Sequence, residues 1–118
     1  MNKHIIKLVV FDLIGGDSAI SPSDGDLLYK QIDKLLSEKQ AVELDFANIT
    51  LITTAFLNAA IGQLYSKFTG DDLNTLLSLK NIAPEDISLF KKVIERAKEF
   101  FANPSSFDQS AKDTFGHE

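Results

Sequence analysis

Two adjacent threonines, Thr53 and Thr54, occupy the place in this sequence where a side chain could take part in regulatory chemistry. They follow a segment with the pattern of a half-buried strand, and they precede apolar residues at helical spacing. A hydroxyl at such a junction can accept a backbone hydrogen bond and cap the helix. It can also receive a phosphate, which the free N–H groups of the helix start would stabilise. Both interpretations stay open, since one threonine can cap while the other remains free.

Side chains suited to catalysis or metal binding do not gather elsewhere in the sequence. His4 and His117 lie near opposite ends without the spacing of a metal site, and the chain has no cysteine. Glu43 and Asp45 share one face of a predicted strand, but no nucleophile or cleft is indicated beside them. Gly15-Gly16 indicates a turn, because no phosphate-binding loop pattern follows a strand. We therefore expect no catalytic residue, no metal and no cofactor.

The length and composition of the chain are typical of one soluble globular domain. Its 118 residues are enough for a single hydrophobic core and too few for two. The net charge is −5, and Lys and Arg are spread along the chain, so we expect no nucleic-acid partner. No apolar run approaches the ~18 residues of a membrane span, and no signal peptide precedes the first β-rich segment. We expect a cytoplasmic protein that does not bind membranes.

Hydrophobic periodicity divides the chain into alternating strands and helices. Strands are predicted at 4–14, 18–20, 41–46 and 75–80, the second of them short enough to pair back on the first. Helices are predicted at 22–38, with Ser21 as the N-cap, and from Phe56 to Phe68, with Gly70 as the C-cap. A third helix opens at Pro84. The predicted buried stripes of the first and third helices include Leu27, Leu28, Ile32, Leu35, Leu36, Ile87, Phe90, Val93, Ile94, Ala97 and Phe101.

The alternation of strands and helices predicts parallel strands joined by right-handed crossovers. Two strands carry polar residues at every second position, and we expect these side chains on a wet face: Glu43, Asp45, Ser78 and Lys80. Helices would then cover one face only. The fold class is α/β, a two-layer domain with an open sheet face, spanning residues 1–101. Residues 102–118 are expected to form a flexible C-terminal tail.

Apolar residues lie on both faces of the first predicted strand. Ile5, Val9, Phe11 and Leu13 share one face, and some of them would be exposed if helices cover only the other. This pattern favours an interface such as a homodimer, or a terminal segment that folds over the strand.

The strand–threonine–helix segment and its flanks resemble the STAS family, of the anti-sigma-factor antagonist type. The likeness is closer to a STAS-like group of small bacterial proteins of unassigned function. It covers roughly residues 4–101 and is carried by Val42–Phe46, Asn48-Ile49, Ile52–Phe56, Gly62–Leu64 and Leu79–Ile82. The resemblance implies a STAS-like domain, with a mixed, mostly parallel open sheet and helices on one face.

In STAS antagonists the corresponding strand leads to an Asp-Ser-Ser-Gly-like turn. One of these serines is phosphorylated by a partner that is both kinase and anti-sigma factor. Thr53 occupies the position of the aspartate, so this sequence differs from the family pattern there. Thr54 occupies the position of the phosphorylated serine. The resemblance therefore implies Thr54 as phosphoacceptor, with Thr53 as the second candidate, and a kinase-like ATP-binding regulator as protein partner.

We predict a bacterial regulatory domain that binds a protein partner and has no catalytic activity. The predicted partner surface contains Thr53, Thr54, Ala55, Phe56, Leu57 and Asn58. Of the two large apolar residues in this turn, one is expected to pack inward and the other to remain on the surface, and helical spacing favours Phe56 as the core residue. The alternative is an unregulated scaffold or self-assembling subunit that uses the open sheet face. A small enzyme or a nucleotide-binding domain is a third alternative.

Overall fold

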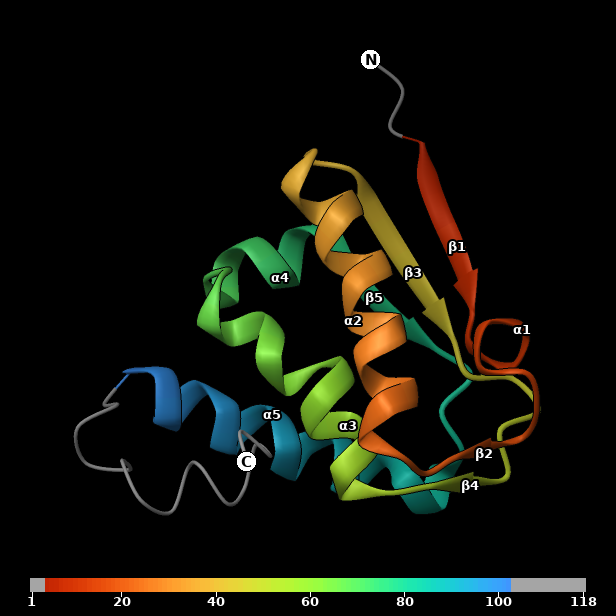
Figure 1. Ribbon diagram of the computed structural model, residues 1–118. Helices are drawn as coiled ribbons and strands as arrows, with labels where there is room; N and C mark the ends of the chain where they lie inside the picture. The colour runs from red at the N-terminus through yellow and green to blue at the C-terminus, as the bar shows by residue number, and fades with distance from the viewer. Residues whose placement is uncertain (1–3, 103–118) are drawn as a thin grey trace.

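Residues 4–102 are described by the computed structural model (Figure 1), and they form an α/β domain with two parallel sheets. The larger sheet contains β1 (Ile5–Val9), β3 (Ala41–Asp45) and β5 (Leu77–Lys80), in the order β1-β3-β5. The smaller sheet pairs β2 (Ser18–Ala19) with β4 (Leu51–Ile52). All these pairs are parallel, so the predicted α/β class with a mostly parallel open sheet is confirmed.

The helices pack on one another and on the larger sheet around a single core. α2 contacts β3, and α3 packs closely against α2 (Figure 1). The described helices are α1 (Val10–Ile14), α2 (Pro22–Ser37), α3 (Thr54–Ala60), α4 (Gly70–Leu76) and α5 (Ile87–Ala102), with the 3-10 helices η1 (Gly62–Ser66) and η2 (Pro84–Asp86). The core contains fully or almost fully buried side chains from most of these elements: Val10, Leu28, Ile32, Leu36, Val42, Leu44, Phe56, Leu57, Ile61, Leu64, Phe90 and Val93.

Burial alternates along β5 and along β3 up to Leu44, because helices cover one face of the larger sheet. Val42 and Leu44, on the covered face of β3, are 1% and 0% exposed. Lys7, Glu43 and Ser78 lie in register on the open face, where Lys7 and Ser78 are exposed and Glu43 is half-buried. The predicted arrangement of one covered and one open face is therefore confirmed.

The first strand is shorter than predicted. It ends at Val9, and the next residues form α1. Gly15 ends this helix in the left-handed conformation (φ 81°), and its N–H donates to the Phe11 carbonyl (3.0 Å). A run of apolar residues fits a strand or a short buried helix equally well, so periodicity could not place the boundary. Phe11 therefore does not extend the sheet face on which a contact was predicted.

The start of α2 is where the sequence predicts it. Ser21 Oγ accepts a hydrogen bond from the N–H of Asp24 (3.1 Å) and caps the helix. The buried stripes differ from the prediction at two residues. Leu27 is 53% exposed and Ile87 is 42% exposed, whereas Leu28 is fully buried. The buried side of α2 is the side that packs against α3, and Leu27 lies outside it.

The region predicted as one long second helix is divided into α3, η1 and α4. Gly70 begins α4 and does not terminate the preceding helix, so its C-cap prediction is wrong. Thr69 Oγ1 accepts from the N–H of Asp72 (3.0 Å), and the Asp72 carboxylate accepts from the N–H of Thr69 (3.4 Å). These two reciprocal hydrogen bonds form a capping box that starts α4 at Gly70, although glycine is more common just after the end of a helix. The predicted strand 75–80 accordingly begins at Leu77.

The C-terminal helix α5 ends at Ala102. The remainder of the predicted tail, residues 103–118, lies outside the described residues, as do residues 1–3. Within the described part, no helix combines the length and apolar character needed to cross a membrane.

Candidate functional site

Thr53 joins β4 to α3 and is the N-cap of that helix. Its Oγ1 accepts a hydrogen bond from the N–H of Phe56 (3.1 Å) and donates one to the carbonyl of Ile20 (2.6 Å). Its own N–H donates to the carbonyl of Ala19 (3.1 Å) and so continues the β2–β4 ladder. The Thr53 hydroxyl is therefore engaged both with the helix and with the neighbouring segment, as the capping interpretation requires.

The small β2–β4 sheet holds this junction in place. β2 runs parallel to β4, with Ala19 opposite Ile52, and does not pair back on β1 as predicted. Next to it, the Asp17 carboxylate accepts a hydrogen bond from Thr50 Oγ1 (3.0 Å), and the Asp17 carbonyl accepts one from the Thr50 N–H (2.9 Å). Hydrogen bonds to residues 17–20 thus hold the segment 50–53 that leads into α3.

Thr54 is the first residue of α3, and its side chain is exposed, as is that of Ala55. Among residues 4–102 the Thr54 hydroxyl has no hydrogen-bond partner. The two threonines therefore divide the roles that the sequence left open: Thr53 caps the helix, and Thr54 presents an accessible hydroxyl. That this hydroxyl is phosphorylated stays a prediction.

The rest of the predicted partner surface lies in the core. Phe56 and Leu57 are 0% exposed, and Asn58 is 5% exposed. The core position predicted for Phe56 is confirmed, but the prediction that the other large apolar residue remains on the surface is wrong, because α3 packs against both α2 and α5. In this fold Phe56, Leu57 and Asn58 cannot contact a partner, so the accessible part of the predicted surface is Thr53, Thr54 and Ala55.

Two apolar side chains extend this accessible part. Ile20 is 45% exposed and Leu51 is 52% exposed. Ser18 lies opposite Leu51, and side chains alternate along a strand, so Leu51 and Ile20 share the outer face of the β2–β4 pair. Thr54 follows β4 closely in the chain. We call Ile20, Leu51, Thr54 and Ala55 the Thr54 surface.

Gly25 allows α2 to approach the first turn of α3. A Cβ atom at this position would lie 2.5 Å from the carbonyl oxygen of Phe56 and 2.7 Å from the Cβ of Ala59. Real Cβ atoms do not approach so closely, so only glycine fits here without a shift of α3. The orientation of the turn that carries Thr54 therefore depends on this helix contact.

Replacing Thr53 by valine should lower the free energy of unfolding by about 1–2 kcal/mol, since the isosteric side chain cannot cap α3. Thr54→Val is the matched control, with an expected change within about 0.5 kcal/mol, because the Thr54 side chain is exposed. Urea unfolding followed by circular dichroism measures both. Equal losses in the two variants would contradict the division of roles between the threonines.

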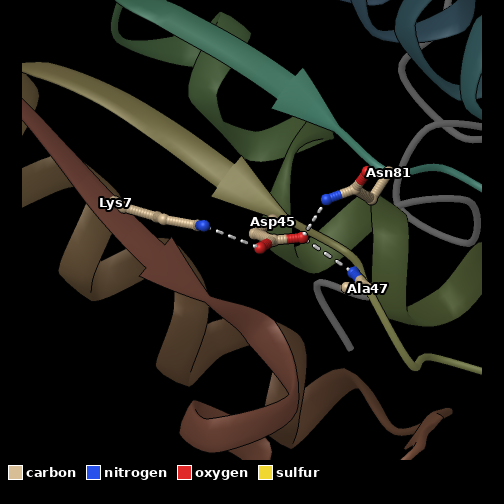
Figure 2. Close-up of polar contacts among 4 residues, drawn as sticks. All are labelled: Lys7, Asp45, Ala47 and Asn81. Carbon is tan, nitrogen blue, oxygen red and sulfur yellow. Dashed lines mark hydrogen bonds and ion pairs between the residues drawn. The ribbon is translucent and has the colours of Figure 1, made fainter.

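A second polar cluster surrounds Asp45 at the end of β3 (Figure 2). Its Oδ1 accepts hydrogen bonds from the N–H of Ala47 (2.9 Å) and from Nδ2 of Asn81 (2.8 Å). Its Oδ2 lies 3.2 Å from Nζ of Lys7. Asp45 was predicted to be solvated, but it is only 6% exposed, because its partners from β1 and from the end of β5 surround it.

These contacts lower the pKa of Asp45 below that of an ordinary aspartate. The hydrogen bond from Asn81 contributes most, followed by the Ala47 N–H, while burial opposes them and Lys7 adds less. The carboxylate is ionised at neutral pH, and both its oxygens have partners. It links β1, the end of β3 and the residue that follows β5, so we assign it a structural role. Across residues 4–102 no group of three or more His, Asp or Glu side chains could hold a metal ion.

Comparison with known families shows that a family model matches this chain. It is described as a STAS-like domain of unknown function (DUF4325), and it matches residues 24–86. The matched segment begins in α2, ends in η2, and includes the Thr53–Thr54 junction and Asp45. Comparison with the curated proteins and with the solved structures gives no significant match.

Proposed function

This chain belongs to the family of STAS-like domains of unknown function, and from this premise we propose that it is a regulatory protein-interaction module switched by phosphorylation of Thr54. The proposal assigns the chain no catalytic step of its own. Its partner would be a protein, and the resemblance to anti-sigma-factor antagonists favours a kinase-like ATP-binding regulator.

The observation that carries this proposal is the difference between the two threonines. Thr53 is held by hydrogen bonds to Phe56 and Ile20, whereas the neighbouring Thr54 is exposed. A kinase needs an accessible hydroxyl at a fixed position, and Thr54 offers one on a turn whose backbone is anchored on both sides. Modification of Thr54 would leave the helix cap intact, so the fold would tolerate both states.

The surroundings of Thr54 explain how a phosphate would change binding. The Thr54 surface contains the exposed side chains of Ile20 and Leu51, and apolar contacts of this kind contribute to docking when they are desolvated. A phosphate adds roughly 1.5–2 negative charges at neutral pH. Burying that charge against a partner without matching cations is unfavourable. We infer that the unmodified form binds and the phosphorylated form is released.

The proposal predicts the outcome of affinity capture from the lysate of the native organism. Wild-type bait should retain a kinase-like ATPase, and Thr54→Glu should reduce its recovery about tenfold or more, since the added charge opposes docking. Thr75→Glu is the matched control, because Thr75 is an exposed threonine on α4, outside the Thr54 surface. Quantitative mass spectrometry of the captured proteins gives the comparison. Equal partner recovery on Thr54→Glu and Thr75→Glu would contradict the switch.

The alternative of a scaffold that assembles through the open sheet face has less support. On that face Lys7, Glu43 and Ser78 lie side by side across the three strands, and Lys80 follows two residues after Ser78 on β5, so the face is largely polar and charged, with the exposed Ile5 at one end of β1. Phe11, which the sequence placed on it, belongs to α1. An open face of this kind is typical of a solvated surface.

A further inference from the structure

Strand β1 has an edge that no described segment covers. The strand order β1-β3-β5 gives β1 one neighbour, and within residues 4–102 its other side forms no backbone hydrogen bond. Such an edge is a template for pairing with another strand.

The hydrogen bonds of the sheet show which groups face this edge. The N–H of Phe46 donates to the carbonyl of Lys80 (2.9 Å), so even-numbered residues of β3 face β5 and odd-numbered ones face β1. In a parallel pair each residue bonds to the two neighbours of the residue opposite. Since Lys7 lies opposite Glu43, the backbone groups of the even-numbered residues of β1 point to β3.

A side-chain contact agrees with this assignment. The Gln40 amide donates to the His4 carbonyl, which places that carbonyl on the β3 side. The outer edge of β1 therefore presents the N–H and C=O groups of Ile5 and Lys7 and the N–H of Val9, whose C=O belongs to the first turn of α1. These residues alternate with Ile6, whose backbone groups are used within the sheet.

The side chains of β1 do not protect this edge. Ile5 is 60% exposed and Ile6 is 38% exposed, and the strand has no proline or glycine. Its one charged residue is Lys7, and lysine often prevents edge pairing. Here Nζ of Lys7 lies 3.2 Å from the Asp45 carboxylate on β3, so the charge is drawn inward and partly neutralised (Figure 2).

We propose that two copies of this chain associate through this edge, with β1 pairing antiparallel to β1 of the second copy to form one continuous sheet. The two-fold axis passes through Ile6, so that the two Ile6 side chains meet. Ile5 of each copy then lies opposite the partner's Lys7, and these residues exchange backbone hydrogen bonds through their outward groups. Both exposed isoleucines are covered, and both helix layers lie on the same side of the joined sheet.

Charge and side-chain alternation disfavour two neighbouring registers. A two-fold axis at Lys7 would place the two lysines directly opposite each other, which is unfavourable across strands. A shift by one residue would place covered-face side chains opposite open-face side chains. The axis at Ile6 avoids both problems and brings β-branched side chains together, which strands favour.

The test is the mass of the full chain in solution, measured by sedimentation equilibrium across the micromolar range. Wild type should approach twice the chain mass of 13.0 kDa. Ile6→Lys, which places two like charges at the axis, should weaken dimerisation at least ~30-fold. Ile87→Lys is the matched control, because Ile87 is a similarly exposed isoleucine on α5. A wild-type protein that stays at the single-chain mass, or variants that dimerise equally, would overturn the proposal.

Amide hydrogen exchange gives a second readout that does not depend on a folded variant. The N–H groups of Ile6 and Leu8 are bonded within the sheet and should be protected at every protein concentration. Those of Ile5 and Lys7 should gain protection, by about tenfold or more, only as the dimer forms. Exchange at Ile5 and Lys7 that stays fast while the mass doubles would place the interface elsewhere and overturn the proposal.

Discussion

Gly25→Ala should lower the free energy of unfolding by about 2–3 kcal/mol, although alanine is normally the better helix residue by roughly 0.5–1 kcal/mol. The new methyl group would lie 2.5 Å from the Phe56 carbonyl oxygen, 2.7 Å from the Ala59 Cβ and 3.2 Å from the Ala60 nitrogen. Two of these atoms belong to the α3 backbone, which cannot move aside as a flexible side chain would. The helices must separate, and the buried contacts between them are lost.

Gly16→Ala is the control for the general effect of replacing a glycine. A Cβ atom at Gly16 would meet no atom within 4 Å, and its backbone does not have a positive φ. We expect Gly16→Ala to change the free energy of unfolding by no more than about 0.5 kcal/mol. Urea unfolding, followed by fluorescence and circular dichroism, measures both variants. If Gly25→Ala were as stable as wild type, the close approach of α2 to α3 would be refuted.

Asp45→Ala should lower the free energy of unfolding by about 2–4 kcal/mol at neutral pH, because it removes a carboxylate that accepts two hydrogen bonds. The donors are the Ala47 N–H and the Asn81 side chain, and Asn81 has a left-handed backbone (φ 60°) that the bond helps to hold. The ion pair with Lys7 contributes less, since the Lys7 side chain is 56% exposed. Glu43→Ala, on the same strand face, is the control and should change stability little.

The lowered pKa of Asp45 also gives this effect a pH dependence. The folded protein holds the carboxylate in its charged form more strongly than the unfolded chain does, so its contribution is fully present above an ordinary carboxyl pKa of ~4. The contribution is lost as the pH falls through the lowered pKa of the folded state. The stability difference between wild type and Asp45→Ala should therefore shrink in acid. A difference that stays constant from neutral to strongly acidic pH would show that packing, and not the charge, stabilises this cluster.

Elements with a regular hydrophobic periodicity or a recognisable N-cap residue could be predicted from the sequence. The start of α2 at Ser21 and the alternation of Val42 and Leu44 along β3 are confirmed, because capping and side-chain alternation are local effects. The predictions failed where tertiary contacts decided the outcome. The residues after Val9 fit a strand or a helix, and burial of Val10 and the turn at Gly15 select the helix.

The candidate site shows the same division. The sequence predicted the junction between strand and helix, and it allowed each threonine to be either the helix cap or the free hydroxyl. The assignment of Thr53 as the held residue also depends on its hydrogen bond to Ile20, which is distant in the chain. The burial of Asn58 depends on α2 and α5, which pack on α3 from distant parts of the chain. The sequence did not reveal the Asp45 cluster, because Lys7 and Asn81 come close to Asp45 only through the register of the parallel strands. A charged residue at the end of a predicted strand was the one sign in the sequence that a buried polar contact could lie there.

If Thr54 carries a regulatory phosphate, the modification can be detected directly by phosphosite mapping. The protein would be isolated from its native cells in several growth states, and the peptide that contains Thr53 and Thr54 would be quantified in modified and unmodified forms by mass spectrometry. We expect phosphate on Thr54 and none on Thr53, with an occupancy of Thr54 that changes between growth states. Quantitative recovery of this peptide without phosphate in every state, or phosphate on Thr53, would contradict it.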